Sequence, residues 1–143
     1  SPHWDPYARG TVVGLTRGAT RAHLARAALE AMAYQAVDAI RAMEAAGSDP
    51  LEELRADGAA TENRWLMQFQ ADVLGVPVVV PEIAETTAMG AALLAGVGAG
   101  LLTLDQVMRL GGEQARYEPR MGDDERATLL GEWHGALARS RGT

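Results

Sequence analysis

The stretch that decides the fold is Leu54-Arg-Ala-Asp-Gly-Ala-Ala-Thr-Glu-Asn-Arg-Trp-Leu-Met-Gln-Phe-Gln-Ala-Asp-Val-Leu-Gly75. It predicts a short strand over Glu53–Asp57, a turn of small residues around Gly58, and an amphipathic helix that ends at Gly75. One face of that helix carries Leu66, Phe69, Gln70 and Val73. A strand that ends in glycine at a helix N-terminus lets backbone N–H groups approach a phosphate, since no Cβ stands in the way. The same pattern is typical of a plain tight turn, so the residues alone leave both interpretations open.

The rest of the chain alternates strand and helix patterns. Further strands are expected over Thr11–Thr16 and over Val76–Val80, a β-branched run bounded by Gly75 and Pro81. A long helix is expected from a cap at Thr20 to about Ala46. Three more helices are expected: Thr87–Gly98, a short one that is opened by a capping box at Thr103 and ends at Gly111-Gly112, and Asp123–Ser140. The alternation is an α/β pattern.

Composition limits the classes of function. The chain has 143 residues, enough for one domain with its own core, and no cysteine for a disulfide or a thiolate site. Its net charge of −6 and scattered basic residues argue against a nucleic-acid partner. The longest apolar run, Ala88–Leu102, is too short and too rich in glycine to span a membrane, and no signal peptide is visible. The start at Ser1, without an initiator Met, suggests an excerpt of a longer protein.

Several motifs, in their order and spacing, resemble the FGGY family of carbohydrate kinases. The block that contains Gly14, His23 and Glu30 is similar to the general family signature. Narrower similarity to the glycerol kinase branch lies in Trp4-Asp-Pro6, Gly14-Leu-Thr-Arg-Gly18 and Leu66-Met-Gln-Phe69. The resemblance extends to Arg116-Tyr-Glu-Pro-Arg120 and Trp133, so residues 1–143 would be a portion of the family's C-terminal, nucleotide-binding domain.

The resemblance implies the ribonuclease-H-like fold that sugar kinases share with actin and Hsp70. The three expected strands would be the third, fourth and fifth of its central sheet, and the first two would be missing. Thr11–Thr16 should then not pair directly with Glu53–Asp57, because the missing strands belong between them. Unpaired strand edges invite pairing with another chain. The expected partners are therefore the missing N-terminal half of the kinase and, for the chain alone, a second copy in a homo-oligomer.

The resemblance also assigns nucleotide contacts to Gly58, Ala59 and Asn63. Gly58 and Asn63 match the family pattern, whereas Ala59 stands where glycerol kinases usually have a second glycine. Glu62 departs as well, and its charge would disfavour a phosphate unless Arg64 pairs with it. In the family the catalytic aspartate and the polyol-binding residues lie upstream. This chain is therefore expected to hold no catalytic residue, and the widely spaced histidines (His3, His23, His134) give no metal site.

The function implied by the resemblance is that of one part of an ATP-dependent glycerol kinase. The complete enzyme would form sn-glycerol 3-phosphate and ADP from glycerol and Mg²⁺-ATP in the cytoplasm, and this chain would supply one wall of the ATP site. The isolated chain is expected to be inactive. Three alternatives stay open: another FGGY kinase (xylulose, gluconate or ribulose type), an inert nucleotide-binding or regulatory fragment, and a structural excerpt that only contacts its missing half.

Overall fold

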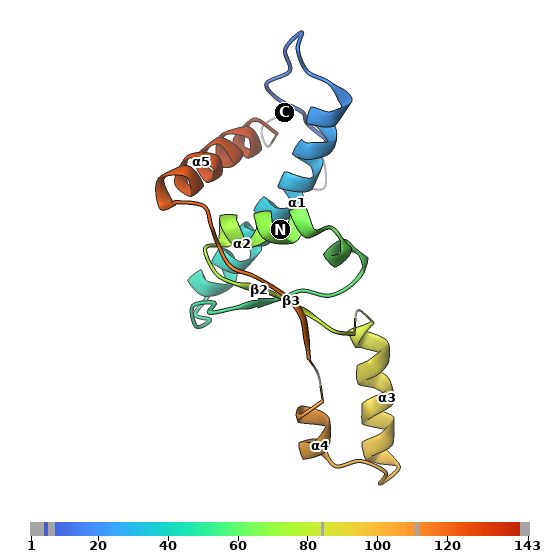
Figure 1. Ribbon diagram of the computed structural model, residues 1–143. Helices are drawn as coiled ribbons and strands as arrows, with labels where there is room; N and C mark the ends of the chain where they lie inside the picture. Colours follow the sequence, from blue (N-terminus) through green and yellow to red (C-terminus); the bar gives the residue numbers. More distant parts are fainter. Residues whose placement is uncertain (1–4, 6–7, 84, 111, 141–143) are drawn as a thin grey trace.

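The computed structural model describes residues 5, 8–83, 85–110 and 112–140. Figure 1 shows its elements, a mixture of helices with one small sheet. They are α1 (Arg21–Ala45), β1 (Leu54–Arg55), the 3-10 helix η1 (Ala59–Glu62), α2 (Arg64–Leu74), β2 (Val78–Pro81), α3 (Thr86–Gly98), α4 (Leu104–Met108), β3 (Glu113–Tyr117) and α5 (Asp123–Ser140). The α/β prediction is confirmed.

The helix ends follow the chemistry of their caps. At the start of α1 the backbone N–H of Thr20 donates to Nδ1 of His23 at 3.0 Å, so His23 is a capping residue. Helix α2 ends at Gly75, whose φ of +78° is a left-handed conformation that favours glycine. The capping box predicted at Thr103 opens α4, because Gln106 N–H donates to the Thr103 hydroxyl at 3.2 Å. The predicted helices are confirmed to within one or two residues of these bounds, except that α4 already ends at Met108.

The sheet has three strands in the order β1-β2-β3. β1 pairs in parallel with β2, and β3 pairs with β2 in antiparallel orientation. The central strand β2 is buried over Val78–Val80, as expected of a β-branched run between two neighbours. In the described part of the chain β1 has a ladder on one side only, so its other edge is open.

Two strand predictions were wrong. Thr11–Thr16 forms no strand: its residues are exposed, and no described segment pairs with them. A strand needs the N–H and C=O groups of a neighbour, and the expected neighbours are the strands missing from this chain. The second error is an omission, because β3 was not predicted at all. Its pattern is a weak alternation in which Ala115 and Tyr117 are half-buried while Gln114 and Arg116 are exposed.

The core lies between α1, α2, α5 and the inner face of the sheet. Its buried residues include Val37 on α1, Phe69 and Val73 on α2, and Val78 on β2. Aromatic rings connect the helices, since Tyr34 lies 5.5 Å from Phe69 and stacks on Trp133 at 5.3 Å. Burial, more than the nearby Glu30 charge, raises the pKa of Tyr34 to about 12. We call α1, α2, α5 and the sheet the body.

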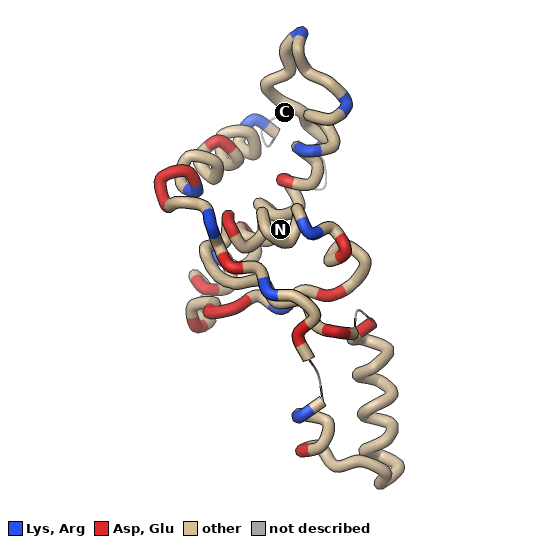
Figure 2. The backbone as a smooth tube through the Cα atoms, viewed as in Figure 1, with Lys and Arg blue, Asp and Glu red and all other residues tan. Residues whose placement is uncertain are grey.

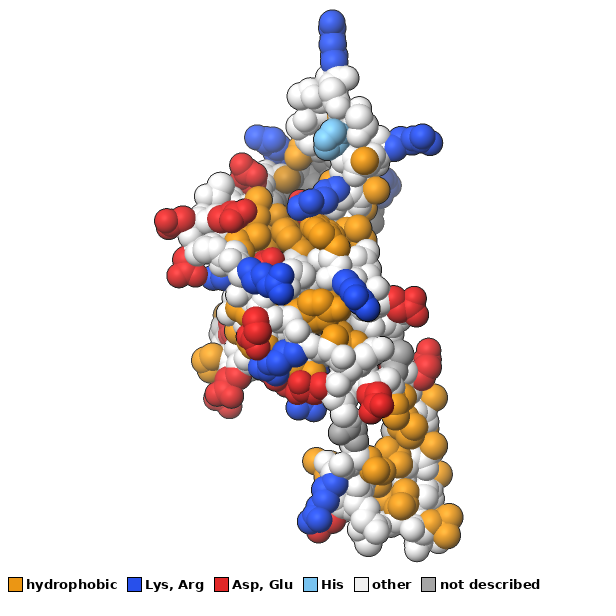
Figure 3. Space-filling view, viewed as in Figure 1, with side chains coloured by type: hydrophobic (Ala, Val, Ile, Leu, Met, Phe, Trp, Pro, Cys, Tyr) orange, Lys and Arg blue, Asp and Glu red, His pale blue; other side chains and the backbone are white. Residues whose placement is uncertain are grey.

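Helices α3 and α4 project from the body, and we call residues 85–110 the arm (Figure 1). None of the residues in α3 or α4 is buried. Large apolar side chains are exposed along the arm, at Met89, Leu94, Leu101, Leu104, Met108 and Leu110 (Figure 3). Figure 2 shows charged residues spread over the body, whereas α3 contains no Lys, Arg, Asp or Glu. The arm therefore presents an apolar surface that the body does not cover.

Candidate functional site

The turn that follows β1 requires glycine for its backbone shape. Gly58 has φ +86° and ψ 176°, a combination that is essentially limited to glycine. A Cβ at this position would meet no atom within 4 Å, so the constraint is conformational and not a lack of space. The turn is therefore open toward one side.

The residues after Gly58 present backbone donors. Thr61 N–H donates to the Gly58 carbonyl at 3.0 Å, which is the first bond of η1. The N–H groups of Ala59 and Ala60 precede that bond and have no carbonyl partner inside this helix. Both residues are exposed. Neither has a positive φ, so Ala59 differs from a glycine by its methyl group and not by strain. Two backbone donors beside an open glycine suit an anionic group such as a phosphate.

Asn63 has a structural task that sequence reasoning missed. It joins η1 to α2, and its Oδ1 accepts from the N–H of Leu66 at 3.1 Å. This is an N-cap, which an asparagine directly before an amphipathic helix could have indicated. The predicted nucleotide contacts Gly58, Ala59 and Asn63 thus lie within one turn, and Asn63 also fixes the start of α2.

Glu62 lies beside this turn and is exposed, as is Arg64. Among the ion pairs of the described residues, none joins Glu62 to Arg64. The pairing that would neutralise Glu62 is therefore not formed here. Its negative charge acts against an anion bound at the turn, although exposure to solvent weakens that effect.

Asp57 ties the turn to the arm. Its Oδ2 accepts a hydrogen bond from the hydroxyl of Thr86, the first residue of α3. The two residues are 29 positions apart in the sequence. The carboxyl end of β1 and the start of the arm are thus held together.

A groove of about 970 Å³ lies between the sheet and the arm. Its polar walls include Arg55, Asp57 and Thr86, and its apolar walls include Met89 and Leu93 of α3. The groove is at the carboxyl ends of the parallel strands β1 and β2, where α/β proteins bind ligands. Of the predicted site residues and their neighbours only Asp57 lines it, so Gly58, Ala59 and Asn63 sit beside the groove and not in its walls.

Other candidate residues have structural partners. Glu30 pairs with Arg26 at 2.6 Å on α1, and His134 contacts the buried Asp38 at 2.9 Å. No group of three or more His, Cys, Asp or Glu among the described residues could hold a metal ion. No helix in the described ranges combines the length and apolarity needed to cross a membrane. His3, Trp4 and Pro6, which entered the sequence argument, lie outside the described residues.

Comparisons of the sequence with known proteins all indicate the same family. Residues 1–99 match the model of the FGGY family of carbohydrate kinases, C-terminal domain. A glycerol kinase from Deinococcus radiodurans is 51% identical over 142 residues, and one from Koribacter versatilis is 53% identical over 143 residues. Each match covers 99% of this chain, which spans only 28% and 29% of the length of these relatives.

Solved structures agree. The Plasmodium falciparum glycerol kinase with ADP superposes with a TM-score of 0.85 at 30% identity, over 100% of this chain and 29% of that one. A xylulose kinase from Rhodospirillum rubrum gives a TM-score of 0.76 at 31% identity, over 94% and 28% of the two chains. These matches confirm the expected ribonuclease-H-like fold, of which this chain holds a part.

Proposed function

Because this chain belongs to the FGGY family of carbohydrate kinases, we propose that it is the C-terminal part of an ATP-dependent glycerol kinase. The observation that carries this proposal is the identity of 51–53% to glycerol kinases along 99% of the chain. The higher TM-score with a glycerol kinase, 0.85 against 0.76 for a xylulose kinase, supports the same branch. The complete enzyme would act in the cytoplasm and form sn-glycerol 3-phosphate and ADP.

This chain would supply one wall of the ATP site. The similar Plasmodium falciparum glycerol kinase was solved with ADP, which supports a nucleotide as the ligand. Gly58 would let the chain come close to the phosphates, the N–H groups of Ala59 and Ala60 would face their negative charge, and Asn63 would hold the start of α2 beside them. ATP, when bound, supplies the phosphoryl group, and positioning by backbone donors is a large part of catalysis in such transfers.

The glycerol site and the catalytic base would lie in the remainder of the enzyme. The Mg²⁺ that accompanies ATP would be bound by the complete enzyme. Since the chain spans 28–29% of its relatives, the N-terminal part would be its main partner. That part would pair with the open edge of β1 and cover the apolar surface of the arm. The chain by itself would self-associate through the open edge of β1.

A second candidate, a regulatory domain, has two observations in its favour. Ala59 adds a methyl at the phosphate turn, and Glu62 adds an exposed charge that Arg64 does not neutralise. Both features fit a regulatory domain that holds nucleotide weakly or not at all. The complete protein should phosphorylate glycerol if it is a kinase and should release no ADP if this chain is a regulatory domain.

The test is a coupled ADP-release assay on the full-length protein and on residues 1–143, with glycerol and Mg²⁺-ATP. The full-length protein should phosphorylate glycerol faster than xylulose, gluconate or ribulose, and the isolated chain should not exceed the rate without enzyme. A full-length protein that prefers xylulose, gluconate or ribulose would overturn the proposal that glycerol is the substrate. One that releases no ADP with any of them would favour the regulatory domain, and turnover by the isolated chain would contradict the placement of the catalytic groups.

A further inference from the structure

Strand β1 leads directly into the turn at Gly58. It is two residues long and pairs only with β2 in the described part of the chain. The hydrogen bonds that flank it run from Leu54 N–H to the Pro77 carbonyl at 2.9 Å and from Ala56 N–H to the Val79 carbonyl at 3.0 Å. Gly58 follows three residues after Arg55, so any shift of β1 moves the phosphate turn with it. A side-chain contact that fixes β1 against the rest of the sheet would therefore also fix the turn at Gly58.

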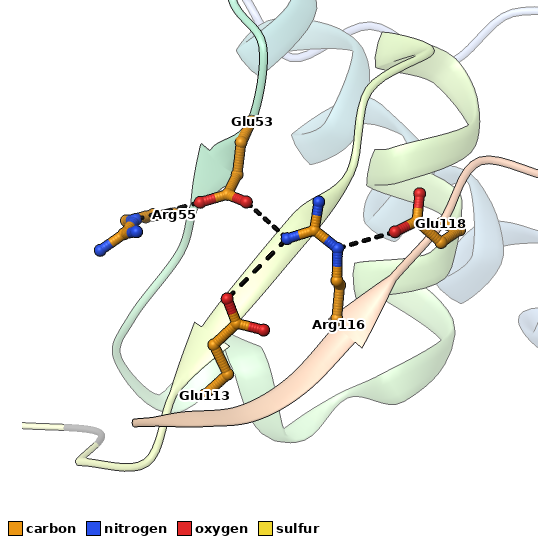
Figure 4. Close-up of polar contacts among 5 residues, drawn as sticks. All are labelled: Glu53, Arg55, Glu113, Arg116 and Glu118. Carbon is orange, nitrogen blue, oxygen red and sulfur yellow. Dashed lines mark hydrogen bonds and ion pairs between the residues drawn. The ribbon is translucent and has the colours of Figure 1, made fainter. Parts of the chain in front are cut away.

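A cluster of charged side chains crosses the sheet at this point (Figure 4). Glu53, directly before β1, contacts Arg116 of β3, with 2.5 Å between Glu53 Oε2 and Arg116 Nη1. These strands are not neighbours, because β2 lies between them. Arg116 sits opposite Val79 of β2 in the ladder. Arg116 and Glu53 are 63 positions apart in the sequence. The contact therefore ties β1 to the far strand of the sheet.

Arg116 is the centre of this cluster. Its Nε lies 2.7 Å from Glu118, and its Nη1 lies 3.9 Å from Glu113 as well as close to Glu53. Arg55 adds a second cation, 3.1 Å from Glu53. The side chains of Glu53 and Arg116 are 25% and 38% exposed, so their contact lies at the surface of the sheet. The hydrogen bond from Arg116 holds the pKa of Glu53 below its ordinary value, so the carboxylate stays charged at neutral pH.

Glu118 provides an internal comparison. It binds the same arginine as Glu53 does, but it follows β3 and is only two positions from Arg116. Its contact stays at the β3 end of the sheet, whereas the Glu53 contact reaches β1. Variants of Glu53 and Glu118 each remove one ion pair of Arg116, but only the Glu53 variant removes the contact with β1.

We propose that Glu53 and Arg116 are positioning residues for nucleotide binding, acting by holding β1 and the turn at Gly58 in place. The inference rests on the proposed kinase function. Both side chains act through the backbone of the turn. Loss of their contact should weaken ATP binding while the glycerol site, which lies elsewhere in the enzyme, is unaffected.

The experiment compares Glu53→Gln with Glu118→Gln in the full-length enzyme, by steady-state kinetics with each substrate varied in turn. Glu53→Gln should raise the KM for ATP roughly threefold, the size expected for a lost surface ion pair, with the KM for glycerol and kcat nearly unchanged. Glu118→Gln should leave all three near the wild-type values. Arg116→Gln should behave like Glu53→Gln, and Arg116→Lys, which keeps a cation, should restore most of the affinity.

Equal effects of Glu53→Gln and Glu118→Gln, or an unchanged KM for ATP in Glu53→Gln, would overturn the positioning role. Parallel changes in the KM for glycerol would do the same, because they would indicate a general loss of structure. Calorimetric titration with ADP gives the same comparison without turnover. A wild-type enzyme that does not phosphorylate glycerol would refute the proposed function, and the ADP titration would still decide the inference.

Discussion

The body and the arm of this chain differ in what holds their helices in place. In the body, α1, α2 and α5 bury aromatic and aliphatic side chains against one another and against β2. In the arm, α3 is a 13-residue helix without a buried residue, and α4 is shorter still. Helices of that length are marginal in water without tertiary packing. The body therefore carries its own core, whereas none of the described residues of α3 and α4 is buried by the rest of this chain.

The largest expected effect is in the body. Phe69→Ala should lower the free energy of unfolding of residues 1–143 by about 3–5 kcal/mol, because it empties a buried site between Tyr34 and Trp65. The matched control is Leu94→Ala on α3, where the side chain is 62% exposed and the expected change is within about 0.5 kcal/mol. Urea unfolding followed by circular dichroism measures both. Similar losses in the two variants would erase the distinction between body and arm.

The second-largest effect is expected for Leu94→Ala in the complete enzyme, where this substitution should no longer be neutral. If the N-terminal part covers the arm, Leu94→Ala in the full-length protein should cost about 2 kcal/mol or more, as for other buried leucines. Thr87→Ala on the same helix is the control, since Thr87 is exposed and polar. Rates of thermal inactivation compare the two variants. A full-length Leu94→Ala enzyme as stable as Thr87→Ala would show that the arm stays exposed.

Helix bounds were predictable in both regions, since α3 of the arm also lies within one residue of its predicted bounds, whereas strand β3 of the body was missed. Helical periodicity and caps placed α1, α2 and α5 to within one or two residues, because each buries one face within this chain. Thr11–Thr16 was predicted as a strand from its local sequence pattern, and such a pattern does not form a strand where no neighbour pairs with it. β3 was missed because only Ala115 and Tyr117 of its short alternation face inward.

The candidate site was predicted in part. The glycine at position 58 follows from strand, turn and helix patterns, and the structure shows the backbone conformation that requires it. The bond between Asp57 and Thr86, and the contact between Glu53 and Arg116, join residues 29 and 63 positions apart. Such pairs depend on the tertiary fold, and one sequence gives no spacing rule for them. The N-cap role of Asn63 does have a local signal, because asparagine directly before an amphipathic helix is a common N-cap.

A smaller effect is expected at the turn, where the body meets the arm. Ala59→Gly in the full-length enzyme should tighten ATP binding by about 1 kcal/mol, or roughly fivefold, because it removes a methyl beside the proposed phosphate site. Ala46→Gly, at an exposed residue directly after α1 and outside the turn, is the control for backbone freedom. Isothermal calorimetry with ATP tests both. Weaker or unchanged binding in Ala59→Gly, or an equal gain in Ala46→Gly, would count against a phosphate at Ala59.

The smallest effect concerns pH and the ion cluster of the body. Since the Glu53 pKa is lowered in the folded chain, its contact with Arg116 stabilises the fold above the ordinary Glu value of 4.5 and is lost as the pH falls through the lowered value. Glu53→Gln should therefore lose less stability than the wild type on acidification below 4.5. Thermal unfolding across that range measures the difference. Parallel curves for the two proteins would contradict a charged contact at Glu53.

The most direct test of the central claim, that this chain supplies one wall of an ATP site and no part of the glycerol site, is the kinetics of Gly58→Ala in the full-length enzyme. An alanine cannot adopt φ +86° with ψ 176° without strain of about 1–3 kcal/mol, so the turn should shift. The account predicts a KM for ATP raised about tenfold, at an unchanged KM for glycerol. An unchanged KM for ATP, or an equal rise for both substrates, would contradict it.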